Sequence, residues 1–177
     1  MSAGEIVSMM EEFESIAKEI EDTHPIPAYY VRLYYLIQAS NLIGSNKTEQ
    51  ILKVKKFVGD RITKLETDKK KLTGDVKSET SKRELVDLVE QKYNELKDSD
   101  ENSSSLTMNH VKAYQKLEKL IQSLDQVKSL DAEWWEKLDE VISRGQEIKS
   151  ALAKGQQPTW KEKVSAPQTD YPQTDSF

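Results

Sequence analysis

The side chains that could carry acid–base or metal chemistry are few and scattered along the sequence. His24 lies beside helix-breaking prolines, His110 lies far from it in the chain, and there is no cysteine. Neither histidine has a second histidine or a spaced carboxylate pair at metal-ligand distance along the sequence. Glu11, Glu12 and Glu14 have the right chemical type for acid–base work, but carboxylates on an exposed helical face are mostly solvated. The sequence therefore predicts no catalytic residue, no metal site and no cofactor.

Signals for binding phosphate or nucleic acid are weak as well. The six glycines are single, and no glycine-rich loop could cradle a phosphate. Residues 47–83 hold twelve basic and six acidic residues, but Phe57 is their only aromatic residue and the whole chain carries a net charge of −5. The lysines of this segment ring the predicted helix and do not line one face, so membrane-surface binding is disfavoured. We predict neither nucleic-acid binding nor direct membrane insertion; steeply salt-dependent binding would indicate the opposite.

The elements that carry these residues are predicted to be helices. Charged residues make up 32% of the chain and hydrophobic residues 36%, a balance typical of long amphipathic helices. Proline is absent from residues 28–157, which is unusual for a loop-rich β fold. The N-terminus lacks the basic start and apolar core of a signal peptide, and no stretch approaches the roughly 18 apolar residues of a membrane span. We expect an all-α, cytoplasmic protein.

Apolar residues recur at helical spacing in three segments of the first half. Ser2 and Glu5 have capping-box spacing at the start of the first helix, which the prolines of "THPIP" end. The second helix contains "PIPAYYVRLYYLIQ", residues 25–38, a stretch that is apolar on most sides and has one charge. A helix apolar on most sides has neighbours on most sides, so we predict that it is central. Gly44 and Gly74 are expected to end the second and third helices.

A second set of three helices is predicted after a polar joint. Ser81 and Glu84 repeat the capping-box spacing at the start of the fourth helix. Residues 97–105, "KDSDENSSS", predict an acidic, serine-rich loop. Thr107 and Asp131 then begin the fifth and sixth helices.

Together these segments predict two three-helix antiparallel bundles in tandem, since helices joined by short connections favour antiparallel neighbours. The first module is predicted at residues 1–74 and is followed by a linker at residues 75–83. The second module is predicted at residues 84–155. A linker or tail without periodicity follows at residues 156–177.

The first bundle is predicted to leave room for a partner helix. Its second helix is too apolar for two neighbours, so the face carrying Val31, Tyr35 and Gln38 stays open unless the second unit covers it. The basic third helix lies beside that face and suits an acidic amphipathic peptide. The candidate partner-binding residues are Tyr35, Lys55, Lys56, Val58, Ile62, Lys64 and Leu65.

Three residues inside the helices need a structural explanation. Arg32 is the sole charge of residues 25–38, and we predict that it orders the fold by pairing with an acid of the first helix, such as Glu19 or Glu21. Gly59 and Gly145 each cost about 1 kcal/mol relative to alanine within a helix. They indicate either a close approach of two helices or a shallow spot where a partner helix lies against the backbone.

Two short stretches resemble a known family. Residues 28–34, Ala-Tyr-Tyr-Val-Arg-Leu-Tyr after an early proline, resemble the second helix of the Vta/LIP-type regulators of the ESCRT AAA ATPase. Residues 148–158, "IKSALAKGQQP", are similar to the closing helix of that family. The order of six helices also agrees, and the resemblance covers residues 1–158.

The resemblance implies two microtubule-interacting and transport (MIT)-like modules that bind the C-terminal helical tails of ESCRT-III subunits in multivesicular-body sorting. It implies a cytoplasmic protein recruited to endosomal membranes. In the family a separate C-terminal domain dimerises and stimulates the AAA ATPase, and that domain is not within these 177 residues. The alternative is a structural helical spacer without a peptide groove, which predicts heptads continuous across residues 98–105.

Overall fold

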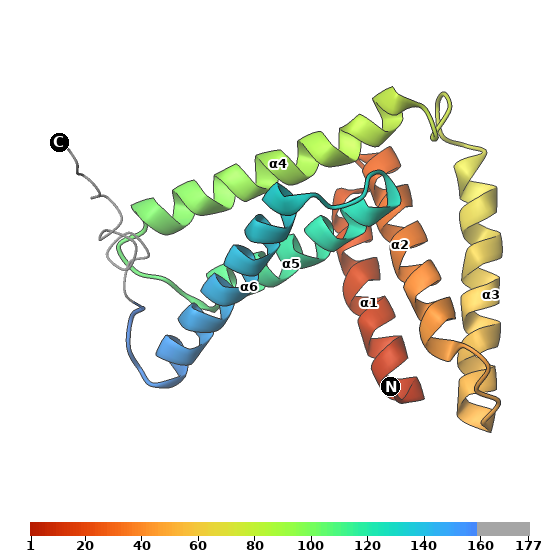
Figure 1. The fold of residues 1–177 in the computed structure, drawn as a ribbon, viewed down its shortest axis with the longest axis horizontal. Helices are drawn as coiled ribbons and strands as arrows, with labels where there is room; N and C mark the ends of the chain where they lie inside the picture. Colours follow the sequence, from red (N-terminus) through yellow and green to blue (C-terminus); the bar gives the residue numbers. More distant parts are fainter. Residues whose placement is uncertain (159–177) are drawn as a thin grey trace.

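The computed structural model describes residues 1–158, and these residues form an all-α fold with no strand among them (Figure 1). The predicted tail at residues 156–177 falls outside the described residues from position 159 onward. The six α helices are α1 (Ala3–Ile20), α2 (Pro25–Ile43), α3 (Glu49–Lys69), α4 (Glu79–Asn102), α5 (Met108–Ser123) and α6 (Ala132–Ala153), and the 3₁₀ turn η1 (Leu124–Gln126) follows α5. The predicted fold class, two three-helix bundles, is confirmed.

Most helix starts lie where the side chains predict them. Ser2 and Glu5 form both bonds of a capping box at the start of α1, and Asp131 accepts from a backbone N–H at the start of α6. Thr107 begins α5, with His110 completing the capping box. The predicted start of α4 at Ser81 is wrong. Ser78 is the cap, because its hydroxyl oxygen accepts from the Ser81 backbone N–H and the helix begins one residue after it.

Two helix ends also differ from the prediction. Helix α3 ends at Lys69, five residues before Gly74. Helix α4 continues to Asn102, so the first two thirds of the predicted loop at residues 97–105 are helical. Local composition favours a loop there, but Asp100 is buried against the second bundle and its contacts hold the last turn in place.

Helix α2 lies at the centre of the first bundle, as predicted. It contacts α1 and α3 within the bundle and α4, α5 and η1 outside it. Val31 and Tyr35 are only 0% and 1% exposed, so the face predicted to stay open is covered. The second bundle covers Val31, which is one of the two outcomes that the prediction left open. Tyr35 is covered within the first bundle, by Glu14 of α1 and Arg61 of α3.

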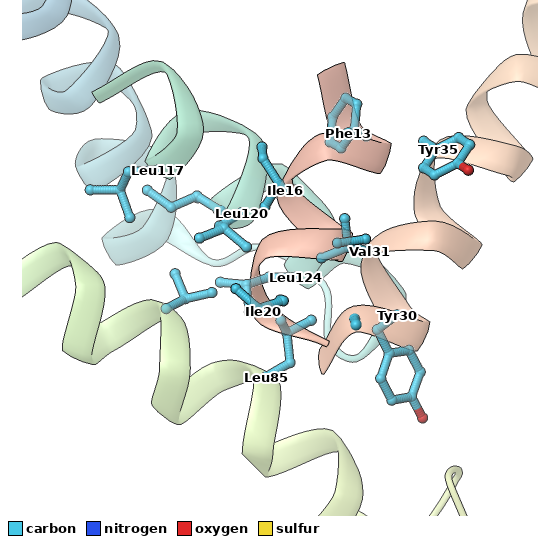
Figure 2. Close-up of a cluster of buried hydrophobic side chains, with 14 of the residues drawn as sticks. Phe13, Ile16, Ile20, Tyr30, Val31, Tyr35, Leu85, Leu117, Leu120 and Leu124 are labelled. Atoms are coloured by element: carbon cyan, nitrogen blue, oxygen red, sulfur yellow. The ribbon is translucent and has the colours of Figure 1, made fainter. Parts of the chain in front are cut away.

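The two bundles share one continuous core. Ile16, Ile20 and Val31 from the first bundle pack with leucines of α4, α5 and η1 (Figure 2). Tyr30 adds a polar contact, because its buried hydroxyl donates to the backbone carbonyl of Val76 in the segment between α3 and α4. The modules are therefore fused through α2, and the division at residues 75–83 stays a prediction. No helix within residues 1–158 has the length and apolar character needed to cross a bilayer.

The second bundle is held at its far end by a buried ionic cluster. Arg144 of α6 donates to both carboxylate oxygens of Asp100 on α4, at 2.7 Å from Nε and 2.8 Å from Nη2. Tyr114 of α5 donates its hydroxyl to the same carboxylate. A Cβ added to Gly145 would lie 3.2 Å from the Cβ of Tyr114, which explains this glycine as a close approach of α5 and α6.

Candidate protein-interaction surface

Helices α2 and α3 run antiparallel and pack along a seam with a seven-residue repeat (Figure 1). The buried seam residues are Tyr29, Leu36 and Ile43 on α2 and Ile51, Val58 and Leu65 on α3. In an antiparallel pair, a residue that follows a seam residue by four positions lies on one side of the seam, and this side is the same for both helices. A residue that follows a seam residue by three positions lies on the other side. The seam therefore has two flanks, which differ in chemistry.

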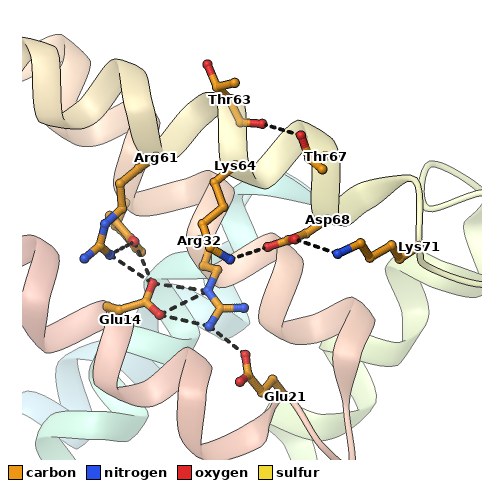
Figure 3. Close-up of polar contacts among 10 residues, drawn as sticks. Glu14, Glu21, Arg32, Arg61, Thr63, Lys64, Thr67, Asp68 and Lys71 are labelled. Carbon is orange, nitrogen blue, oxygen red and sulfur yellow. Dashed lines mark hydrogen bonds and ion pairs between the residues drawn. The ribbon is translucent and has the colours of Figure 1, made fainter.

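The flank facing α1 is filled by a polar cluster (Figure 3). Arg32 Nη2 lies 2.9 Å from Glu14 Oε2 and 2.7 Å from Glu21 Oε2. Tyr35 donates its hydroxyl to Glu14 Oε1 at 2.7 Å and accepts from Arg61 Nη1 at 2.8 Å. These bonds join α1, α2 and α3 around one carboxylate. The cluster lines a hollow of about 310 Å³.

The predicted pairing of Arg32 with an acid of the first helix is confirmed. Arg32 pairs with Glu21, as expected, but the more buried partner is Glu14, with a side chain only 12% exposed. Glu19, the other candidate, pairs with Lys116 of α5 instead, at 2.8 Å. The periodicity of the first helix indicates that Glu14 borders the apolar face, and this signal could have identified it.

The cluster fixes the protonation states of its members. Burial alone would raise the pKa of Glu14, but hydrogen bonds from Arg32 and Tyr35 outweigh it, so the pKa of Glu14 is lowered. Burial, followed by the bond to Glu14, raises the pKa of Tyr35. Burial opposes the charge of Arg32, yet the hydrogen bonds to Glu14 and Glu21 raise its pKa. Glu14 is therefore an ionised acceptor between neutral and cationic donors at pH 7.

The opposite flank is apolar and open to solvent. We call it the α2–α3 strip and define it as Leu33 and Ile37 on α2 with Leu52, Gly59 and Ile62 on α3. Three of these side chains are exposed, Ile37 by 39%, Leu52 by 48% and Ile62 by 40%, and Leu33 is half-buried. Gly59 is exposed, and a Cβ added there would meet no atom within 4 Å. Exposed apolar side chains gathered on one surface are a common mark of an interaction site.

The strip is bordered by charged residues of α3. Lys55 follows the seam residue Ile51 by four positions, so it lies on the strip side and is exposed. Glu66 is exposed four positions after Ile62. Burial and the nearby charge of Glu66 together raise the pKa of Tyr29, which places this carboxylate beside the α2 seam.

The seven predicted partner-binding residues are thus divided among four environments. Ile62 and Lys55 belong to the strip and its border. Val58 and Leu65 are buried in the seam, 3% and 6% exposed. The remaining three lie elsewhere on the bundle: Tyr35 and Lys64 line the polar hollow with Leu65, and Lys56 is exposed and pairs with Asp60.

Three strip residues were missed by the sequence prediction, namely Leu33, Ile37 and Leu52. The seven-residue spacing of the seam could have found them, because it separates the two sides of each helix. The apolar character of α2 all around its axis concealed this pattern, since nearly every direction carried a large side chain.

The arrangement defines a class of all-α proteins, built from two fused three-helix bundles with an apolar strip between two helices of the first. Residues 9–154 match the family described as Vta1 like, and the chain belongs to this family. Its members are non-catalytic regulators of the Vps4 AAA ATPase in multivesicular-body sorting. A comparison with curated proteins found no match.

Proposed function

We propose that this chain binds the C-terminal helical tails of ESCRT-III subunits on the α2–α3 strip of its first module. The observation that carries the proposal is the exposure of Ile37, Leu52 and Ile62 along one side of a single helix pair in a member of a regulator family. An amphipathic helix covers such a surface with its apolar face and leaves its polar face in water.

The charges around the strip suit an acidic tail. Lys55 lies on the strip side of α3, and Lys56 lies one position further around the helix. Both side chains reach solvent, where they attract an acidic peptide and are screened by salt. Lys64 extends the positive potential along α3 from the side of the polar hollow.

In this proposal the buried candidates Tyr35, Val58 and Leu65 hold the helices in place and do not contact the tail. Val58 and Leu65 keep α3 against α2, and Tyr35 holds α1 and α3 together through Glu14 and Arg61. Gly59 gives the tail a close approach to the backbone, since no side chain stands between the helix and solvent at that point. Binding at endosomal membranes follows from recruitment by the tails and requires no insertion into lipid. Contact with the AAA ATPase belongs to the separate C-terminal domain that the family resemblance implies.

The test is a titration of the ¹⁵N-labelled chain with a synthetic acidic ESCRT-III tail peptide at low salt. We expect chemical-shift changes concentrated at Gly59, Ile62 and their neighbours on α2. Ile62→Asp places a charge under the apolar face of the peptide and should weaken binding by about tenfold or more. Met108→Asp is the matched control, because Met108 is 47% exposed and lies on the second module.

Three results would count against the proposal: no shifts at millimolar peptide, shifts confined to the second module, or equal losses for Ile62→Asp and Met108→Asp. Absence of binding to every ESCRT-III tail would favour the alternative, a helical spacer without a peptide site.

A further inference from the structure

A second surface lies between the two modules, away from the α2–α3 strip. A cleft of about 570 Å³ separates α1 from α5. Figure 1 shows α1 and α5 diverging from the region where the bundles share their core, with the space between them opening toward the N-terminus of α1. The Lys116–Glu19 ion pair, at 2.8 Å, joins the two helices beside the cleft. We call this space the intermodule cleft.

The walls of the intermodule cleft carry opposite charges. Glu11 and Glu12 line it from α1, and Lys112 and Lys119 line it from α5. Glu11, Glu12 and Lys112 are exposed, and none of the three forms an ion pair within residues 1–158. Lys119 is half-buried, with its ammonium 6.0 Å from the centre of the Phe13 ring. These charges face one cleft and do not pair across it. A partner that carries basic groups beside α1 and acidic groups beside α5 is therefore attracted electrostatically by both walls.

The shape of the cleft suits a helix more than an extended strand. Gly4, Ser8 and Ser15 keep the α1 wall shallow, while the half-buried Val7 adds apolar surface and the buried Ile16 lies at the floor. Small side chains on one helix let a second helix approach closely. From Gly4 to Ile16 the wall is about 18 Å long at ~1.5 Å per residue, which matches a partner helix of about three turns.

We propose that the intermodule cleft binds a charge-segregated amphipathic helix of a partner protein. The apolar stripe of that helix faces Val7, its basic border faces Glu11 and Glu12, and its acidic border faces Lys112 and Lys119. A uniformly acidic helix is repelled by the α1 wall, so this partner differs in chemistry from the one proposed for the α2–α3 strip. The two surfaces lie on different helices, and occupation of one leaves the other accessible.

The test uses a 14-residue synthetic helix with a leucine–alanine stripe, lysines along one border and glutamates along the other. Binding to the full 177-residue chain is measured by fluorescence anisotropy and mapped by chemical shifts. We expect the shifts on α1 and α5. Ser8→Trp fills the cleft from an exposed position and should raise Kd about tenfold or more. Ile62→Asp, on the α2–α3 strip, should leave Kd unchanged.

Reversing the charge of the α1 wall distinguishes electrostatic recognition from the steric block that Ser8→Trp introduces. Glu11→Lys combined with Glu12→Lys makes both walls basic, so the double variant should bind the segregated helix at least about tenfold more weakly. A second synthetic helix with glutamates on both borders should bind the double variant more tightly than it binds the unmodified chain. Circular dichroism of each variant confirms that the fold is retained.

Several outcomes would overturn the inference. These are no binding of the segregated helix, shifts that map away from α1 and α5, an unchanged Kd in Ser8→Trp, or no gain from the charge reversal. If the chain alone dimerises in sedimentation experiments and Ser8→Trp abolishes the dimer, a second copy fills the cleft and a separate partner is refuted. None of these results depends on tail binding at the α2–α3 strip, which Ile62→Asp tests separately.

Discussion

Replacing Asp100 by asparagine should destabilise the fold more than any surface substitution. The side chains of Asp100 and Arg144 are 7% and 2% exposed, and two hydrogen bonds of 2.7 and 2.8 Å join them. Asparagine has a similar shape but no charge, so the guanidinium of Arg144 loses its buried counter-ion. Removing one partner of a buried pair costs about 3–5 kcal/mol, because the other charge stays desolvated.

The loss is expected at the lower end of that range. Glu147 also accepts from Arg144 and is 37% exposed, so part of the charge stays compensated. About 3 kcal/mol is a large share of the roughly 5–15 kcal/mol that stabilises a typical domain. At about 2–4 °C per kcal/mol for a chain of this size, the melting temperature should fall by about 6–12 °C.

Urea denaturation followed by circular dichroism at pH 7 measures the loss. Tyr114→Phe is the matched control, since it removes one hydrogen bond to the same carboxylate and should cost about 1 kcal/mol. Asp100→Leu combined with Arg144→Met should recover at least half of the stability, because a well-packed apolar pair can replace a buried ion pair. The reasoning is refuted if Asp100→Asn costs less than about 1 kcal/mol, or if the double variant is no more stable than Asp100→Asn.

Three further predictions concern stability. Gly59→Ala should stabilise the chain by about 0.5–1 kcal/mol in urea denaturation, whereas Gly145→Ala should show no gain, because its new Cβ would lie 3.2 Å from another Cβ; equal gains would contradict the packing. Tyr30→Phe removes the buried hydroxyl that donates to the Val76 backbone carbonyl, and it should lower the free energy of unfolding by about 1–2 kcal/mol in the same assay. An unchanged free energy of unfolding would refute this contact. The pKa values of Glu14 and Asp100 are lowered on folding, so their contribution is present above the unfolded pKa and is lost as pH falls below about 4. Urea midpoints between pH 7 and pH 3 should fall less steeply in Glu14→Gln, and an identical slope would contradict the assignment.

The central position of α2 could be predicted from sequence because its signal is local. Residues 25–38 contain one charge, and a helix apolar around its whole circumference needs neighbours on all sides. Composition does not identify the chain segments that supply those neighbours. The second bundle supplies several of them, so Val31 is buried where an open face was one of two expected outcomes.

The end of α4 depends on a contact that the local sequence does not show, and the α2–α3 strip depends on a periodicity that composition conceals. Residues 97–105 have the composition of a loop, and the distant partners Arg144 and Tyr114 make a helical Asp100 favourable. Likewise, Lys64 and Ile62 are two residues apart on α3, but the helical rotation between them puts one beside the polar hollow and the other on the strip. Composition identified α3 as a basic helix, whereas its two flanks emerge from the seven-residue spacing of the seam.

The most direct test of the proposed recognition mode is paramagnetic relaxation enhancement with a spin-labelled acidic ESCRT-III tail peptide bound to the ¹⁵N-labelled chain. The account predicts that the amide signals of Gly59 and Ile62 broaden strongly, while those of Val7 and Lys112 in the intermodule cleft stay sharp. Broadening centred on the intermodule cleft or on α6, with Gly59 and Ile62 unaffected, would contradict it.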